Sequence, residues 1–147
     1  MDILNHVGLT VSNIESSVEF YSGLLGLGAP PEDWVFVIGG EWLGKLVAED
    51  APVARVAFLP MDGDTVLELL EYQQPAGEKT NTRPNRDVGA MHLAINVDDV
   101  DAVYERLKGL VRFNSEPQTV PNGPWAGGRV AYLQDPDGTP VELVQSA

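Results

Sequence analysis

The sequence contains nearly the same phrase twice, and this internal repeat constrains the fold more than any other feature. Residues 4–21 read LNHVGLTVSNIESSVEFY, and residues 90–107 read AMHLAINVDDVDAVYERL. The two phrases agree position by position, so that His6 aligns with His92 and the apolar residues align with one another. A repeat of this kind predicts one supersecondary unit built twice.

Each half predicts a strand, a helix and three further strands. A short alternating run ends at Ser-Asn or Asp-Asp, which is typical of a strand that stops at a helix N-cap. We expect the two helices to end near Gly23 and Gly109. The last strand of each half follows an Asp-Gly turn, which favours an antiparallel hairpin. The remaining strands are expected near residues 33–38 and 53–60 in the first half, and near 111–117 and 129–134 in the second.

These elements predict an α+β protein made of two tandem βαβββ modules. The chain has 147 residues, which suits one domain with a duplicated interior. We expect a single domain over residues 1–147, with module one at 1–75, a linker at 76–88 and module two at 89–147. Hydrophobic residues make up 44% of the chain and charged residues 21%, as in ordinary soluble globular proteins.

Charge and composition exclude several classes of partner and site. The net charge of −13 disfavours nucleic acid and anionic membrane surfaces. No apolar run approaches the roughly 20 residues that cross a bilayer, and the N-terminus lacks the pattern of a signal peptide. We therefore expect a cytoplasmic protein that acts on a small molecule. The absence of cysteine excludes disulfides, thiolate metal ligands and a cysteine nucleophile.

Four polar residues occupy strand positions where apolar residues would be expected. Side chains alternate along a strand, so His6 and His92 share a face with small or polar neighbours, opposite the apolar face that packs under the helix. Glu68 and Glu142 hold equivalent positions in the two last strands. Each residue alone could be a satisfied core histidine or a glutamate on an edge strand. Together, two imidazoles and two carboxylates suit one divalent ion such as zinc, nickel, cobalt, manganese or iron(II).

Several motifs resemble those of the vicinal oxygen chelate superfamily, which includes glyoxalase I, methylmalonyl-CoA epimerase, bleomycin-binding proteins and extradiol dioxygenases. The motifs are HVGLTVSNIESSVEFYSGLLGL, LELLEY, MHLAINVDDVDAVYERL and DPDGTPVEL, which together span nearly the whole chain. The resemblance implies two βαβββ modules that form a metal-holding half-barrel, often in a homodimer. It also implies that the metal ligands come from the first and last strands of each module, at His6, Glu68, His92 and Glu142.

The four-ligand pattern is similar to glyoxalase I and the epimerases, which implies proton transfer beside a carbonyl group. The substrate would be a thioester, a hemithioacetal or another carbonyl compound, and the ion would act as a Lewis acid for an enolate or enediolate. We expect Glu142 to be the base, with Glu68 able to return the proton. One departure from the epimerases is that the segment PVARVAFLP, residues 52–60, contains no acid. The alternatives are a drug- or metabolite-binding protein of the bleomycin-resistance type and a ring-cleaving extradiol dioxygenase.

Two segments are expected to shape a substrate cavity. Residues 39–50 read GGEWLGKLVAED, a short amphipathic helix that places Trp42 on a lid or on a plain packing helix. The Pro/Gly-rich loop at 121–130 carries Trp125 and Arg129, which could contact a substrate ring or carboxylate. The alternative for this loop is an ordered turn with Trp125 in the core. Asn96, on the face that carries His92, is a further candidate for substrate binding.

Overall fold

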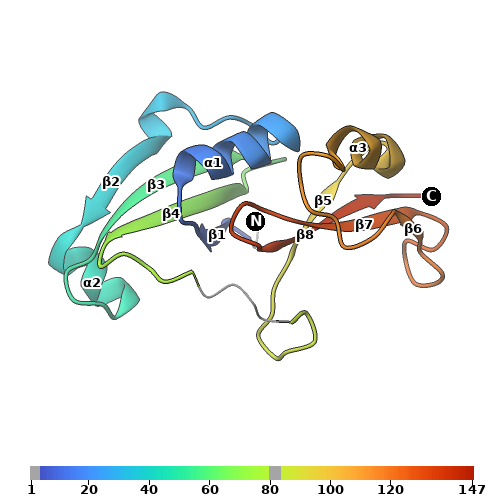
Figure 1. The fold of residues 1–147 in the computed structure, drawn as a ribbon. Helices are drawn as coiled ribbons and strands as arrows, with labels where there is room; N and C mark the ends of the chain where they lie inside the picture. Colours follow the sequence, from blue (N-terminus) through green and yellow to red (C-terminus); the bar gives the residue numbers. More distant parts are fainter. Residues whose placement is uncertain (1–3, 80–83) are drawn as a thin grey trace. The chain divides into compact units, whose positions relative to one another are not determined.

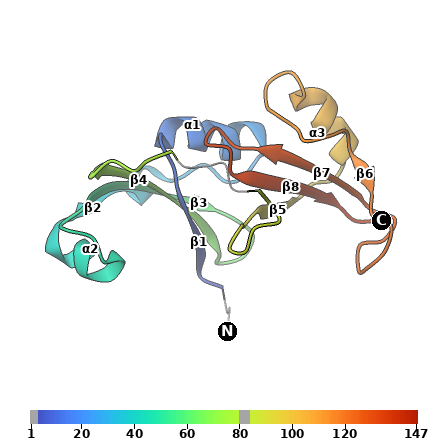
Figure 2. The ribbon, with the colours of Figure 1, turned by 60° about the horizontal axis from the view of Figure 1, so that its bottom comes forward.

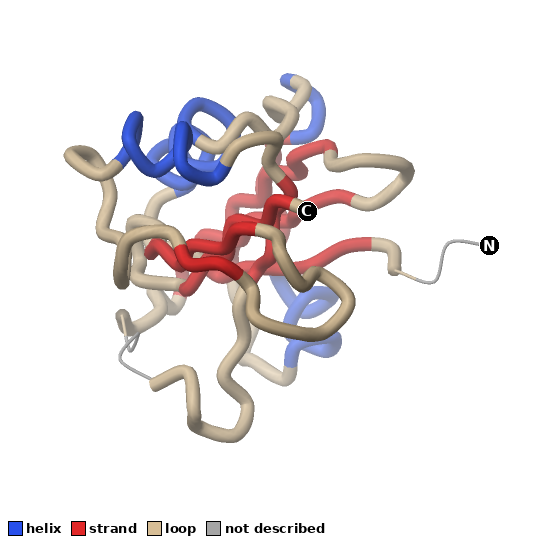
Figure 3. The backbone as a smooth tube through the Cα atoms, turned by 90° about the vertical axis from the view of Figure 1, so that its right-hand side faces the viewer, coloured by secondary structure: helices blue, strands red, loops and turns tan. Residues whose placement is uncertain are grey.

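The computed structural model describes residues 4–79 and 84–147, so residues 80–83 of the predicted linker lie outside the described residues. The chain divides into two compact units, Met1–Lys79 and Thr80–Ala147. Strands dominate both units, and helices make up a smaller part of the chain (Figure 3). In the described part of the chain, no helix has the length and apolar character needed to cross a membrane.

The first unit is a four-stranded sheet in the order β1-β4-β3-β2 (Figure 1). Its strands are β1 (His6–Thr10), β2 (Val35–Gly39), β3 (Val53–Pro60) and β4 (Val66–Gln74). β1 runs parallel to β4, whereas β2, β3 and β4 are antiparallel neighbours. Parallel strands need a crossover, and in this unit the chain from β1 reaches β4 by way of the first helix and two strands.

The helix after β1 covers one face of this sheet (Figures 1 and 2). This helix, α1 (Ile14–Val18), continues as a π-helical turn over Glu19–Leu24. The helical backbone ends at Leu24, so the expected end near Gly23 is confirmed. A Cβ atom at Gly23 would lie 2.8 Å from the Glu19 carboxylate group, which would have to move aside.

A second helix in this unit, α2 (Gly40–Val47), confirms the amphipathic helix predicted over residues 39–50. It follows a 3-10 turn over Glu32–Trp34 and strand β2. Leu43 is buried, whereas Trp42 is 63% exposed. The helix thus packs against the unit through the side that carries Leu43, as expected for an amphipathic helix.

The second unit repeats the arrangement with the strand order β5-β8-β7-β6. Its strands are β5 (Leu93–Asn96), β6 (Gln118–Thr119), β7 (Arg129–Gln134) and β8 (Pro140–Gln145). β5 is parallel to β8, and the other neighbours are antiparallel. Helix α3 (Val100–Leu107) lies over this sheet (Figure 2) and ends just before Gly109, as expected. The two sheets confirm the predicted α+β class and the tandem modules.

One predicted strand of the second unit is wrong. Residues 111–117 make only an isolated bridge, between Phe113 and Leu133. The paired strand comes later and is short, at Gln118–Thr119. Pro117 and Pro121 lie on either side of this strand, and proline has no N–H to donate to a ladder. Pairing with β7 resumes before Pro117, where the Asn114 N–H donates to the Tyr132 carbonyl.

The helix starts are built alike in the two units. Asn13 accepts a hydrogen bond from the Ser16 N–H, and Asp99 accepts one from the Ala102 N–H, so both predicted N-caps are confirmed. The core of each unit lies between its helix and its sheet, and it includes the fully buried residues Leu67, Leu69, Leu133 and Leu143. Because strand side chains alternate, the residues adjacent to these leucines, among them Glu68 and Glu142, lie on the opposite face of each sheet.

Candidate functional site

The first unit places His6 and Glu68 on the sheet face that points away from α1. Gly8 on β1 lies opposite Glu68 on β4, and Phe58 on β3 lies opposite Glu68 on its other side. A Cβ atom at Gly8 would lie 3.3 Å from Oε2 of Glu68. Glycine at this position therefore leaves room for the carboxylate at the centre of the sheet.

His6 and Glu68 form a polar pair in this unit. Nε2 of His6 lies 3.4 Å from Oε2 of Glu68, and the two side chains are 45% and 17% exposed. On the other side of the ring, Nδ1 of His6 lies 2.7 Å from Oδ1 of Asn5. An amide oxygen accepts a hydrogen bond, so an N–H on Nδ1 would donate in this contact. A neutral imidazole with its proton on Nδ1 carries its lone pair on Nε2, the atom that contacts Glu68, and this form of histidine binds a metal.

The second unit holds an equivalent pair, His92 and Glu142. Nε2 of His92 lies 3.1 Å from Oε2 of Glu142. Here a third group joins the pair, because the Tyr132 hydroxyl lies 3.2 Å from Oε2 of Glu142 and 3.3 Å from Nε2 of His92. The rings of His92 and Tyr132 meet edge to face at 5.3 Å.

Tyr132 is held as a neutral hydrogen-bond donor. Burial and the neighbouring Glu142 carboxylate raise the pKa of Tyr132 to about 12. The hydroxyl therefore keeps its proton throughout the neutral range and donates to Glu142.

Sequence reasoning missed Tyr132, although the repeat contains the signal that identifies it. Tyr132 lies opposite Glu142 in the sheet register, and Phe58 lies opposite Glu68 in the same way. An alignment of the last two strands of each half would have matched Tyr132 with Phe58 and shown that only the second half has a hydroxyl group at this position. The two His–Glu pairs are thus equivalent in backbone position but not in their surroundings.

The donor set of each pair fits two neighbouring ligands of one divalent ion. With ligand bonds of about 2.1 Å, two donors lie about 3.0 Å apart at a right angle and about 3.4 Å apart at a tetrahedral angle. The observed separations of 3.1 and 3.4 Å fall within this range. Within either unit, the described residues bring no three histidine, aspartate or glutamate side chains together as a possible metal site. The sharing of one ion by all four residues stays a prediction.

The other residues predicted to bind substrate are spread over the chain. Trp42 lies on α2, and Asn96 is an exposed residue at the end of β5, on the face of His92. Trp125 lies in a turn and is 58% exposed, so the alternative that placed it in the core is wrong. A role of these three residues in substrate binding stays a prediction.

Arg129 has structural partners in the second unit. Its guanidinium donates to both carboxylate oxygens of Asp101 on α3, at 2.6 and 2.8 Å, and to the Thr119 hydroxyl at 3.0 Å. Arg55 makes the equivalent link in the first unit, where it donates to Glu15 on α1 at 2.7 Å. Both arginines therefore fasten a helix to its sheet, on the side opposite the His–Glu pair.

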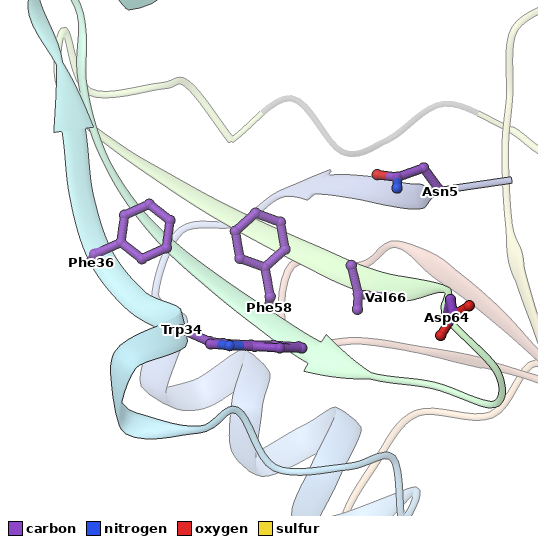
Figure 4. A pocket seen from close by; sticks show the side chains of 6 residues that line it. All are labelled: Asn5, Trp34, Phe36, Phe58, Asp64 and Val66. Atoms are coloured by element: carbon purple, nitrogen blue, oxygen red, sulfur yellow. The ribbon is translucent and has the colours of Figure 1, made fainter.

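A pocket that sequence reasoning did not predict opens in the first unit. Its volume is about 370 Å³. Figure 4 shows three aromatic side chains at one end and two polar side chains at the other. The lining residues are Asn5, Trp34, Phe36, Phe58, Asp64 and Val66.

Comparisons with known proteins agree with this architecture. The sequence model of the Glyoxalase/Bleomycin resistance protein/Dioxygenase superfamily matches residues 3–143. A 2-epi-5-epi-valiolone epimerase from Actinomyces sp is 37% identical over 144 residues, which cover 96% of this chain and 78% of that protein. A probable lactoylglutathione lyase from Vibrio cholerae is 27% identical over 146 residues, with 96% and 88% covered. The crystal structure of a glyoxalase family protein from Bacillus cereus matches with a TM-score of 0.81 at 20% identity, over 97% of this chain and 93% of the other.

Proposed function

The chain belongs to the glyoxalase/bleomycin resistance/dioxygenase superfamily, and we propose that it is a divalent-metal-dependent epimerase acting at a carbon beside a carbonyl group. The observation that carries this proposal is the pair of His–Glu contacts at equivalent positions in the two units, with separations suited to metal ligands. Relatives named as an epimerase and as a lyase support chemistry of the isomerase or lyase type. The epimerase has the higher identity of these two, which favours epimerisation.

In this proposal His6, Glu68, His92 and Glu142 hold one divalent ion between them. Two neutral imidazoles and two carboxylates offset the charge of the ion and suit zinc, nickel, cobalt, manganese or iron(II). When bound, such an ion supplies Lewis-acid polarisation of the substrate carbonyl, which makes the neighbouring C–H bond acidic.

The carboxylates of the two units provide the proton transfer. Epimerisation requires that a proton leave one face of a carbon and return to the other. Glu142 is the proposed base, and the Tyr132 hydroxyl orients its Oε2 atom by donating a hydrogen bond to it. Glu68 is the proposed group that donates a proton to the other face; its carboxyl group would take this proton from solvent before the step, and Glu142 would release the proton it has accepted to solvent afterwards. Glu68 has the sheet position of Glu142 but faces Phe58, so it lacks the phenolic donor.

Solvent isotope exchange tests the proposed function directly. The metal-loaded protein is incubated in D2O with 2-epi-5-epi-valiolone, the ketone from which the epimerase relative takes its name. Proton NMR then follows the hydrogens on the carbons beside the carbonyl group. We expect deuterium to enter one of these positions and the epimer to accumulate, and we expect a chelator to abolish both. If the metal-loaded protein catalyses no exchange with this ketone or with thioesters and hemithioacetals, the epimerase proposal is wrong and the binding-protein alternative gains support.

A further inference from the structure

The pocket of the first unit adjoins the His6–Glu68 pair on the same sheet face. Phe58 lies directly opposite Glu68 in the register, and Val66 lies directly opposite His6. Asn5, a third lining residue, contacts the His6 ring through its side-chain oxygen at 2.7 Å. A molecule in this pocket would therefore touch residues that flank both members of the pair.

The pocket combines an aromatic end with a polar end (Figure 4). The rings of Phe36 and Phe58 lie 6.0 Å apart, and Trp34 completes this end. Trp34 is 39% exposed and Phe36 is 42% exposed, so a substantial aromatic surface is accessible in the unit. At the other end Asp64 offers carboxylate oxygens. The Asn5 amide offers N–H groups, since its oxygen already faces His6.

We infer that this pocket binds an uncharged, polyhydroxylated ring, which makes a ring ketone with several hydroxyl groups the substrate class of the neighbouring site. The inference rests on the proposed function. The face of an aromatic ring carries negative potential, and it attracts the C–H groups of carbons that bear hydroxyls. The hydroxyls at the rim of such a ring would donate to Asp64 and accept from Asn5. The volume of about 370 Å³ suits a small molecule of this size.

The charges around the pocket disfavour an anionic substrate. The charged lining residue is Asp64, Glu68 lies next to Phe58, and the whole chain carries a net charge of −13. The strand arginine of this unit, Arg55, is paired with Glu15 at the helix side of the sheet. The phosphates of a coenzyme A thioester or the carboxylates of a glutathione adduct would therefore be repelled here, whereas an uncharged ring would not.

Binding measurements separate this inference from the proposed function. Calorimetric titration with 2-epi-5-epi-valiolone, a polyhydroxylated ring ketone, should give a dissociation constant at least about tenfold higher for Trp34→Ala than for the wild type. Asp64→Asn should weaken binding several-fold, because a neutral amide accepts hydroxyl hydrogen bonds less strongly than a carboxylate. Metal content should be the same in both variants. Val37→Ala is the matched control, since Val37 lies on β2 opposite Arg55 and outside the pocket.

Each outcome has a distinct meaning. Binding that depends on Trp34 and Asp64 without any isotope exchange would retain the pocket assignment and reject the epimerase proposal. Wild-type affinity in Asp64→Asn and Trp34→Ala would overturn the pocket assignment, whatever the exchange result. Equal affinity for unsubstituted cyclohexanone, or tighter binding of glutathione, would overturn the assigned ligand class. Circular dichroism and thermal melting verify that Trp34→Ala is folded. If Trp34→Ala does not fold, the affinity of Asp64→Asn alone tests the pocket assignment.

Discussion

The Tyr132 hydroxyl donates a hydrogen bond of 3.2 Å to Oε2 of Glu142, whereas the residue opposite the equivalent carboxylate, Glu68, is a phenylalanine. Glu68 faces the ring of Phe58, which differs from tyrosine only by the missing hydroxyl. The surroundings of the two glutamates thus differ by this hydroxyl group. In the proposed reaction this group orients Glu142 as the base and leaves Glu68 free of that constraint.

Replacing Tyr132 by Phe should slow proton exchange while preserving the fold. A hydrogen bond to a charged group contributes about 1.5–3 kcal/mol, so we expect the exchange rate to fall by roughly tenfold or more. The measurement is the rate of deuterium incorporation, with kcat and KM determined separately and the metal content checked. Tyr104→Phe, on α3 where its ring packs against Phe113, is the control. An unchanged kcat in Tyr132→Phe would show that the hydroxyl does not orient the base.

Metal stoichiometry should reveal whether the two His–Glu pairs share one ion. If all four residues bind the same ion, the wild type holds one ion per chain, and either His6→Ala or His92→Ala loses most of the affinity. If each pair binds its own ion, the wild type holds two, and each variant keeps one. Elemental analysis and calorimetric titration with zinc distinguish these results, and only the first agrees with the proposed site.

Replacing Glu142 by Gln should cost more activity than the same change at Glu68. Glutamine keeps the shape and one oxygen donor but removes the basic carboxylate. We expect exchange to fall by roughly 10²-fold or more in Glu142→Gln, the usual scale for loss of a general base. Glu68→Gln should lose less if Glu68 is mainly a ligand. A fully metallated and fully active Glu142→Gln protein would place the base elsewhere.

The Asp101–Arg129 ion pair should make part of the stability depend on acidic pH. The Arg129 guanidinium lowers the pKa of Asp101 below its ordinary value. A carboxyl group with a lowered pKa in the folded state stabilises the fold above its unfolded pKa of about 3.9, and this contribution is lost as the pH falls through the folded value. Asp101→Asn should therefore lower the melting temperature at pH 6, and this difference should shrink as the pH falls below the unfolded value of about 3.9. A difference in melting temperature that stays constant as the pH falls would contradict a charge-based link.

The local sequence pattern determined most of the fold. Strand alternation around His6 and His92 assigned both histidines to the polar face, and Asn13 and Asp99 identified the helix starts. These features depend on contacts between residues close in the chain, so a single sequence contains them. The duplication identified the candidate glutamates, because it showed that Glu68 and Glu142 hold the same position in the last strand of each half.

Tertiary structure alone decided which side chains meet across strands. The expected strand over 111–117 was wrong because the continuous pairing with β7 falls at Gln118–Thr119, and residues 111–117 make a single bridge to that strand. The register between β7 and β8 brings Tyr132 to Glu142, and that between β3 and β4 brings Phe58 to Glu68.

The same holds for Arg129 and for the pocket. The pleat of β7 turns Arg129 toward Asp101 on the helix side, a contact that the loop pattern did not indicate, and its role in substrate binding stays a prediction. The pocket joins Asn5, Trp34 and Asp64, which come from three separate segments of the chain. Local periodicity specifies the face on which a residue lies, whereas its neighbours on that face are set by long-range strand pairing, which the sequence pattern of one strand does not contain.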